Sequence, residues 1–365
     1  MKYTKAITTQ SSTFTIDNSH ETWTLAEGQT ITSSSIGIFE WSDYHENTIV
    51  VNGGIWGGGA SSAGIDTFGD KTTIKVGATG TISGLQGIRA FGDQFTLVNN
   101  GTISGNVTGV ILSGDAGTLI NNSSISGLTG FDVESDAGQA TRIVNNGTIT
   151  ATGNWAGGGD IGDETLINHG TLDGNVSLWS GNDVFDNRGG SFGNHYIQGD
   201  EGNDIFIIDS KIAIVENDGE GTDTVKSTVT MNLATGVLSG EEIEKLTLLG
   251  TKDLNGTGNE LDNTIKGNSG NNHLSGVAGD DILTGGKGDD IFLFKAGFDH
   301  DTITDFGLGA DRIDLSDFTA VTSFADLMAH HVTKSGTDLI IHAGTDQLTL
   351  EHTAKADLQT VDFIF

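Results

Sequence analysis

Short apolar runs of three or four residues recur along the first half of the chain, separated by Gly, Asn and Asp. Each period holds three such runs, for example 102–104, 109–112 and 118–120. Runs this short between turn residues are typical of β-strands, and a fixed period of this length is typical of a solenoid. We therefore predict one coil of three strands per repeat. Copies spaced by 22 to 24 residues start at Val76, Val98, Ile120, Val144 and Ile167.

Stacking these coils would place one apolar residue and one asparagine of each repeat in internal columns. The expected apolar column comprises Ile82, Ile103, Ile125, Ile149 and Leu172, and the expected polar column Asn99, Asn121, Asn145 and Asn168. Stacking buries side chains that no single repeat could bury alone. Asparagine tolerates a left-handed bend, and its amide can hydrogen-bond from coil to coil. We interpret both columns as structural.

A second period, of nine residues, occupies 258–293 in four copies without a gap. The best copy reads GGKGDDIFL at 285–293, and a looser cluster precedes it at 178–186, 190–198 and 199–207. The copies match the nonapeptide pattern G-G-x-G-x-D-x-U-x of calcium-binding β-helical repeats. The first six residues of each copy predict a turn and the last three a short strand. The apolar residue at position eight should point inward; these residues are Ile265, Leu274, Leu283 and Phe292.

Charge explains why such turns need a cation. The chain has 49 acidic and 17 basic side chains, a net charge of −32, and a compact state with this charge repels itself. Two nonapeptides complete one coil, so residues 18 apart stack at the ~4.8 Å spacing of neighbouring strands. Calcium suits stacked acidic turns, because it accepts about six to eight oxygen ligands in loose geometry, whereas magnesium demands a tight octahedron.

The candidate ligands follow from this stacking. In the main cluster Asn263 pairs with Asp281 and Asn272 with Asp290, and the glycines let backbone carbonyls turn toward the ion, as at Gly279 and Gly288. The two asparagines replace a charged ligand by a neutral one, which should weaken the outermost sites. Single Asp-Gly turns need no metal, but tandem copies in register favour calcium.

Two further sites are expected. In the first cluster Asp183 and Asp204 occupy position six on the same side, so one ion is expected between them, whereas His195 leaves the opposite side without a carboxylate. Beyond Asp281, a further ion would use Asp299, which lies 18 residues on, or Asp301, if an insertion shifts the pattern. Both alternatives remain open at this point.

From about residue 178 to the end, the chain resembles the RTX family, the calcium-binding β-roll proteins exported by bacterial type I secretion. Beyond the nonapeptides, 215–225 and 301–306 look like segments that flank such rolls, and the tail 362–365 is similar to the family's C-terminal secretion signal. The resemblance implies export of an unfolded chain and folding outside the cell when calcium binds. This route would explain why residues 1–10 lack an apolar signal-peptide core. Residues 47–177 resemble, more loosely, the right-handed parallel β-helices of bacterial surface adhesins and polysaccharide-acting enzymes.

The predicted fold is therefore all-β, a right-handed parallel β-helix solenoid continuing into calcium-binding RTX β-rolls. The expected parts are an N-terminal cap or assembly segment (1–46), a parallel β-helix (47–177), a first repeat cluster (178–209), a β-rich spacer (210–257), the RTX β-roll (258–301), and a C-terminal cap with secretion signal (302–365).

Composition and motifs exclude several classes of function. The acidic excess excludes nucleic acid as a partner, the lack of cysteine excludes a disulfide scaffold, and no apolar run approaches the ~20 residues of a membrane span. Neither H-E-x-x-H nor a suitably flanked G-x-S-x-G motif is present, and 47–177 holds only four basic residues, so an enzyme is the least favoured class.

We expect an extracellular or cell-surface structural protein that assembles on binding calcium, as in a surface layer, filament or biofilm matrix. The alternative is an adhesin that binds a cell-surface polysaccharide through Trp56 and Trp155, which stand beside glycine runs.

Overall fold

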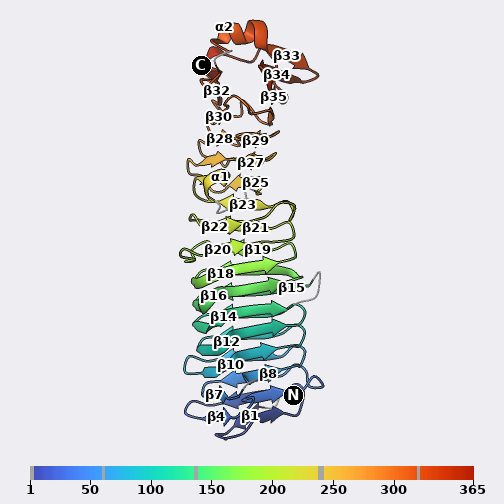
Figure 1. The fold of residues 1–365 in the computed structure, drawn as a ribbon, viewed down its shortest axis with the longest axis vertical. Coiled ribbons are helices and arrows are strands. Elements are labelled where there is room, and N and C mark those ends of the chain that lie inside the picture. The colour runs from blue at the N-terminus through green and yellow to red at the C-terminus, as the bar shows by residue number, and fades with distance from the viewer. Residues whose placement is uncertain (1–3, 60–61, 135–138, 237–241, 319–320) are drawn as a thin grey trace. The chain divides into compact units, whose positions relative to one another are not determined.

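The computed structural model describes residues 4–59, 62–134, 139–236, 242–318 and 321–365 (Figure 1). It divides into two compact units, unit 1 (Met1–Asp204) and unit 2 (Ile205–Phe365). Nearly every element is a β-strand that pairs in parallel with a strand of the neighbouring coil, so each unit is a parallel β-solenoid. The all-β solenoid prediction is confirmed. The division at 204/205 falls inside the first expected repeat cluster, 178–209.

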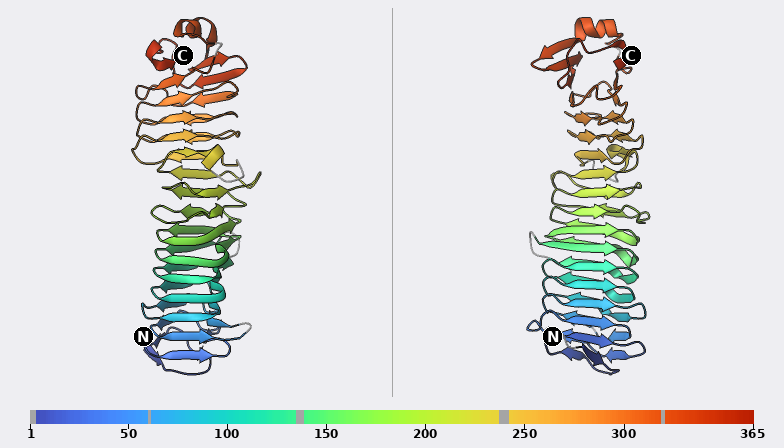
Figure 2. Two further views of the ribbon diagram at one scale, coloured as in Figure 1. Left: turned by 60° about the vertical axis from the view of Figure 1, so that its left-hand side comes forward. Right: turned by 180° about the vertical axis from the view of Figure 1, so that it is seen from behind.

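The strands of unit 1 form two parallel stacks (blue to green in Figures 1 and 2). The first stack comprises β1 (Thr4–Ile7), β3 (Thr22–Leu25), β6 (Thr48–Val51), β9 (Thr73–Val76), β11 (Thr96–Asn99), β13 (Thr118–Asn121), β15 (Ala140–Asn145), β17 (Asp163–Asn168) and β19 (Val184–Asp186). The second stack comprises β2 (Phe14–Ile16), β4 (Thr30–Ser33), β5 (Ile38–Glu40), β7 (Gly54–Gly57), β8 (Ala63–Thr67), β10 (Thr81–Ala90), β12 (Thr102–Ser113), β14 (Ser124–Glu134), β16 (Thr148–Asp160), β18 (Thr171–Trp179) and β20 (Tyr196–Gln198).

The predicted apolar column of unit 1 is confirmed. Strand register pairs its five members in succession from Ile82 to Leu172, and each is at most 1% exposed. Full burial of one such side chain stabilises a fold by about 1.5–3 kcal/mol, so the column provides a core without any metal. The three predicted strands per coil are present, but the first two join into one long strand. In β12, for example, the runs 102–104 and 109–112 are continuous through a register shift.

The predicted asparagine column is also confirmed, and it is longer than expected. The Nδ2 group of each buried asparagine donates to Oδ1 of the next, from Asn99 to Asn168, at 2.8 Å. Asn168 continues the column by donating to Asn187 at 2.6 Å. Because each buried amide satisfies the next, the column removes the penalty that buried polar groups would otherwise impose.

Residues 4–46 belong to the solenoid rather than to a separate fold. Strand β1 pairs in parallel with β3, and β3 with β6, in the same register as the later coils. The sequence shows little repeat pattern here, yet Ile16, Leu25 and Ile31 are fully buried. The boundary expected at residue 46 therefore marks no change of architecture.

Unit 2 also has two parallel stacks (yellow to red in Figures 1 and 2). The first holds β21 (Ile205–Ile208), β23 (Thr224–Ser227), β25 (Lys245–Leu248), β27 (Thr264–Lys266), β29 (Ile282–Thr284), β31 (His300–Ile303) and β35 (Asp346–Leu350); the second holds β24 (Met231–Asn232), β26 (Asn255–Thr257), β28 (His273–Ser275), β30 (Ile291–Leu293), β32 (Arg312–Asp314) and β36 (Phe363–Ile364). The remaining elements are β22 (Ala213–Val215), α1 (Leu233–Gly236), α2 (Phe324–Asp326), the π-helix η1 (Leu327–His331), β33 (Val332–Ser335), β34 (Asp338–Ala343) and the 3₁₀ helix η2 (Thr360–Asp362).

The nonapeptides stack as the 18-residue rule requires. Strand β27 pairs with β29, and β28 with β30, so that Ile265 lies on Leu283 and Leu274 on Phe292. All four side chains are fully buried. The position-eight prediction is confirmed.

The last part of unit 2 departs from the parallel pattern. Strands β33, β34 and β35 pair antiparallel, and β35 also pairs in parallel with β31. The short helices α2 and η1 precede this hairpin, and Ser323 caps α2 by accepting the backbone N–H of Asp326. None of the helices that the structure describes has the length and apolar character required to cross a bilayer.

Candidate metal centre

Position-six side chains form a buried column along one side of the roll. Register places Asn263, Asp281 and Asp301 on successive coils. Oδ1 of Asp281 accepts the backbone N–H of Asn263 at 2.7 Å, and Oδ1 of Asp301 accepts the N–H of Asp281 at 2.9 Å. All three residues are 1% exposed. The carboxylates of Asp281 and Asp301 are therefore buried, and each contacts the backbone of the preceding coil at its turn.

A second column runs on the other side of the roll. Oδ1 of Asp290 accepts the N–H of Asn272 at 2.7 Å, and Oδ1 of Asp311 accepts the N–H of Asp290 at 3.0 Å. Oδ2 of Asp311 accepts a further N–H, from Gly307, at 2.8 Å. This column thus repeats the pattern of the first, but its last carboxylate is satisfied on both oxygens.

Three carboxylate oxygens of the roll lack a partner in the protein. Oδ2 of Asp281, Asp290 and Asp301 is buried and makes no hydrogen bond. Burial, together with neighbouring acidic groups, raises the pKa of Asp281 to about 7, that of Asp290 to about 6 and that of Asp301 to about 8. A buried, ionised oxygen without a partner is unfavourable. A cation beside it would supply the missing charge and ligand contact.

Glycine makes room for these carboxylates. Gly276 and Gly285 begin the nonapeptides of Asp281 and Asp290, and a Cβ at either position would overlap Oδ2 of the aspartate in the same copy. Gly279 and Gly288 have φ values of +98° and +124°, which side-chain-bearing residues rarely adopt. The turns therefore leave room for the carboxylates of Asp281 and Asp290.

The two asparagine candidates differ from the aspartates. Oδ1 of Asn263 accepts the N–H of Asn259 at 2.8 Å, and Oδ1 of Asn272 accepts the N–H of Asn268 at 2.8 Å. Their Nδ2 groups donate to the carbonyls of Ile243 and Leu254. The backbone therefore satisfies both amides.

The structure separates Asp299 from Asp301. Asp301 is buried and stacks on Asp281, whereas Asp299 is exposed at φ +59° and accepts the N–H of Gly279 at 3.4 Å. The coil between Asp281 and Asp301 holds two residues more than a pair of nonapeptides, so the 18-residue rule points to Asp299, whereas strand register places Asp301 on Asp281. The geometry supports Asp301 as the ligand candidate.

The first cluster contains a similar carboxylate column in unit 1. Oδ1 of Asp204 accepts the N–H of Asp183 at 2.7 Å, and Oδ1 of Asp183 accepts the N–H of Glu164 at 2.5 Å. Oδ2 of Asp183 is buried without a hydrogen bond, and burial together with the nearby acids raises its pKa to about 9. On the opposite side, Nε2 of His195 lies 3.1 Å from Oδ1 of Asp173.

Sequence spacing missed several acidic residues that accept backbone N–H groups in the roll. Besides Asp311, Glu244 accepts the N–H of Asp223 at 2.7 Å, and Asp305 accepts the N–H groups of Gly285 and Gly286 at 2.9 and 2.8 Å. These residues lie outside the tandem copies, where the coil length varies. For Asp311 and Glu244, the signal that could have found them is an acidic residue about 20 positions from a known member of a column.

The donor set fits calcium. Across the described ranges, no three His, Cys, Asp or Glu side chains gather into a metal-binding group. A cation at these turns would meet the unpartnered Oδ2 atoms of Asp281, Asp290 and Asp301, and carboxylate oxygens are ligands that calcium accepts.

Comparison with known proteins agrees with this geometry. Residues 257–292 match the family model of the RTX calcium-binding nonapeptide repeat, in four copies. These residues are RTX repeats. Calcium is accordingly the cofactor of this part of the chain. The RTX resemblance is confirmed here, within the segment that holds Asp281 and Asp290.

A search of solved structures finds extracellular lipase LipA from Serratia marcescens, at 18% identity and a TM-score of 0.27. The match covers 64% of this chain and 41% of the lipase chain, so this chain spans well under half of that protein. A likeness this weak carries no argument about activity. The search of curated proteins finds no match.

Proposed function

We propose that this protein is a secreted, calcium-folded structural component of a bacterial cell surface or extracellular matrix. The observation that carries the proposal is the set of buried carboxylates whose second oxygen has no partner in the roll, at Asp281, Asp290 and Asp301. With these groups ionised and no cation present, the roll is destabilised. Calcium converts the same groups into contacts that hold neighbouring coils together.

Export fits this dependence on calcium. RTX repeats are associated with type I secretion, in which an unfolded chain crosses the envelope. A roll that is unstable at low cytosolic calcium leaves the chain unfolded, so that it can cross the envelope. The roll then folds outside the cell, where calcium is abundant. A net charge of −32 opposes premature compaction in the same way.

A structural role is supported by the large share of the chain that forms repeating coils. Most described residues form coils that repeat the same contacts, and such solenoids present long regular surfaces to partners. We propose that these surfaces mediate self-association once calcium has ordered unit 2.

Two measurements on the whole chain test the proposal separately. Calorimetric titration of chelator-treated protein with calcium should release or absorb heat, with binding to more than one ion; a flat titration contradicts calcium-driven folding. Electron microscopy and light scattering with calcium or EDTA should show ordered polymers only with calcium. Protein that binds calcium but stays monomeric would refute the assembly role and leave calcium-driven folding standing.

A further inference from the structure

One outward face of unit 1 carries two regular rows of hydroxyl side chains. Strand register aligns the outward residues of β10, β12, β14 and β16 from coil to coil. Successive coils are ~4.8 Å apart, so the hydroxyl groups repeat at that interval. The rows are Thr81, Thr102, Ser124 and Thr148, and next to them Ser83, Ser104, Ser126 and Thr150.

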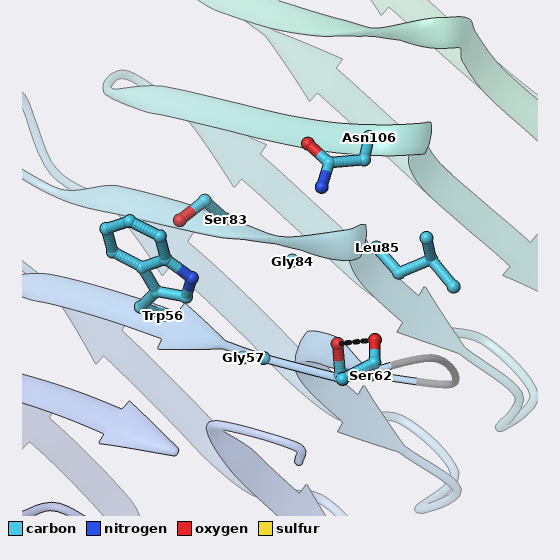
Figure 3. A pocket seen from close by; sticks show the side chains of 9 residues that line it. Trp56, Gly57, Ser62, Ser83, Gly84, Leu85 and Asn106 are labelled. Carbon is cyan, nitrogen blue, oxygen red and sulfur yellow. Dashed lines mark hydrogen bonds between the residues drawn. The ribbon is translucent and has the colours of Figure 1, made fainter. Parts of the chain in front are cut away.

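A tryptophan stands at the end of the second row. Trp56 of β7 pairs with Ser83, and its side chain is 63% exposed. It lines a surface pocket of about 380 Å³ together with Ser83, Leu85 and Asn106 (Figure 3). Residues 57–59 of the same pocket are glycines, so they add backbone polar groups without covering the indole.

A second exposed aromatic residue lies farther along unit 1, in a different column of the coils, because register aligns Trp155 with Thr129 rather than with Ser126. Trp155 of β16 is 36% exposed and packs edge-on against Tyr196. Its coil is four steps from that of Trp56, or ~19 Å at the usual strand spacing. The exposed side chains of Val107 and Leu128 lie at the bends of the coils between the two tryptophans.

The charge of the face selects the class of ligand. All the residues that line the Trp56 pocket are uncharged, while the chain as a whole carries −32. A polyanion would be repelled by the surrounding field, whereas a neutral polymer would not. An indole offers a flat apolar surface to the C–H face of a sugar ring, and hydroxyl and amide groups nearby can hydrogen-bond the sugar hydroxyls.

We propose that this face binds a neutral polysaccharide, with Trp56 as the stacking platform and the Ser/Thr rows running alongside the glycan chain. A polymer suits the site better than a single sugar, because the rows repeat over several coils. This binding goes beyond the calcium-dependent role and uses none of its candidate ligands.

Affinity electrophoresis of the whole chain tests the proposal. Gels containing dextran, laminarin or hydroxyethyl cellulose serve as neutral probes, and a gel containing alginate serves as the anionic comparison. We expect at least one neutral polymer to retard the protein and alginate to have no such effect. Unchanged migration in all three neutral gels, or retardation by alginate alone, would overturn the proposal.

Two matched variants locate the site. Trp56→Ala should weaken the retention at least tenfold, whereas Trp41→Ala should leave it unchanged, because Trp41 is 56% exposed but packs on Phe39, away from the hydroxyl rows. Equal retention of the two variants would refute the assignment of Trp56. Far-UV circular dichroism confirms that each variant is folded. Retention should persist in EDTA, so that failure of calcium binding and failure of glycan binding are distinguishable.

Discussion

Replacing Asp301 by asparagine should stabilise the metal-free protein and destabilise the calcium-bound one. Asparagine keeps an oxygen that can accept the backbone N–H of Asp281, as Asp301 does now. It removes the charge on a side chain that is 1% exposed and whose Oδ2 has no partner. Asn263 shows that an asparagine fits this position of a coil.

The magnitude follows from the raised pKa of Asp301. Burial raises this pKa from 3.8 to about 8. The group therefore contributes stability below pH 4 that is lost as the pH rises through about 8. At pH 8 the loss is at most roughly 5 kcal/mol, since one pKa unit corresponds to ~1.4 kcal/mol. Relaxation of the metal-free roll reduces this figure, and even a fifth of it moves the melting temperature of a unit this size by about 2–4 °C.

Thermal melting in EDTA and in calcium, at pH 5 and pH 8, measures the effect. In EDTA, Asp301→Asn should melt above the wild type at pH 8, and the gap should narrow at pH 5. In calcium the order should reverse. Asp299→Asn is the matched control, because Asp299 is exposed, and it should change neither melting temperature by more than about 1 °C. If Asp299→Asn shows the crossover and Asp301→Asn does not, our choice between these residues is wrong.

Three further predictions concern separate features of the fold. Asn121→Ala should destabilise unit 1 by about 1–3 kcal/mol in denaturant titrations, with calcium and with EDTA alike, because it leaves buried amides unpaired. The control Asn122→Ala, in the exposed row beside it, should cost under about 0.5 kcal/mol in the same titrations. Val277→Gly should stabilise the roll by about 1 kcal/mol, because Val277 adopts φ +98°; a lower melting temperature for this variant would contradict that strain. Gly276→Ala should weaken calcium binding measured by calorimetry, since the added Cβ would displace the Asp281 carboxylate; wild-type affinity would show that this carboxylate is not a ligand.

Much of the fold could be predicted because stacked repeats leave the same residue at the same place in every coil. Ile103 and Asn121 recur with their neighbours at a nearly constant period, so the columns could be inferred from spacing alone. The same reasoning found the pairing of Ile265 with Leu283. Repeat spacing did not reveal that residues 4–46 belong to the solenoid. A solenoid coil needs only an inward apolar residue and a turn, and neither has to repeat as a motif.

The stacking of the candidate ligands was predictable where copies of the nonapeptide can be recognised, as for Asp183 and Asp204. Within the tandem nonapeptides, the 18-residue rule places Asp281 and Asp290 correctly on Asn263 and Asn272. Where a coil gains two or three residues, the strands keep their register and the extra residues enter the turn. Spacing then misleads, as it does between Asp299 and Asp301. Which carboxylate oxygens lack a partner depends on backbone geometry that no spacing reveals.

Hydrogen exchange of the intact chain, with calcium and with EDTA, tests whether calcium orders the roll. Amides in 258–301 should gain strong protection when calcium is added, while amides in the columns of 98–172 should be protected to the same degree in both conditions. Equal protection of 258–301 with and without calcium would show that the buried carboxylates are stable without the ion, and would refute calcium-driven folding.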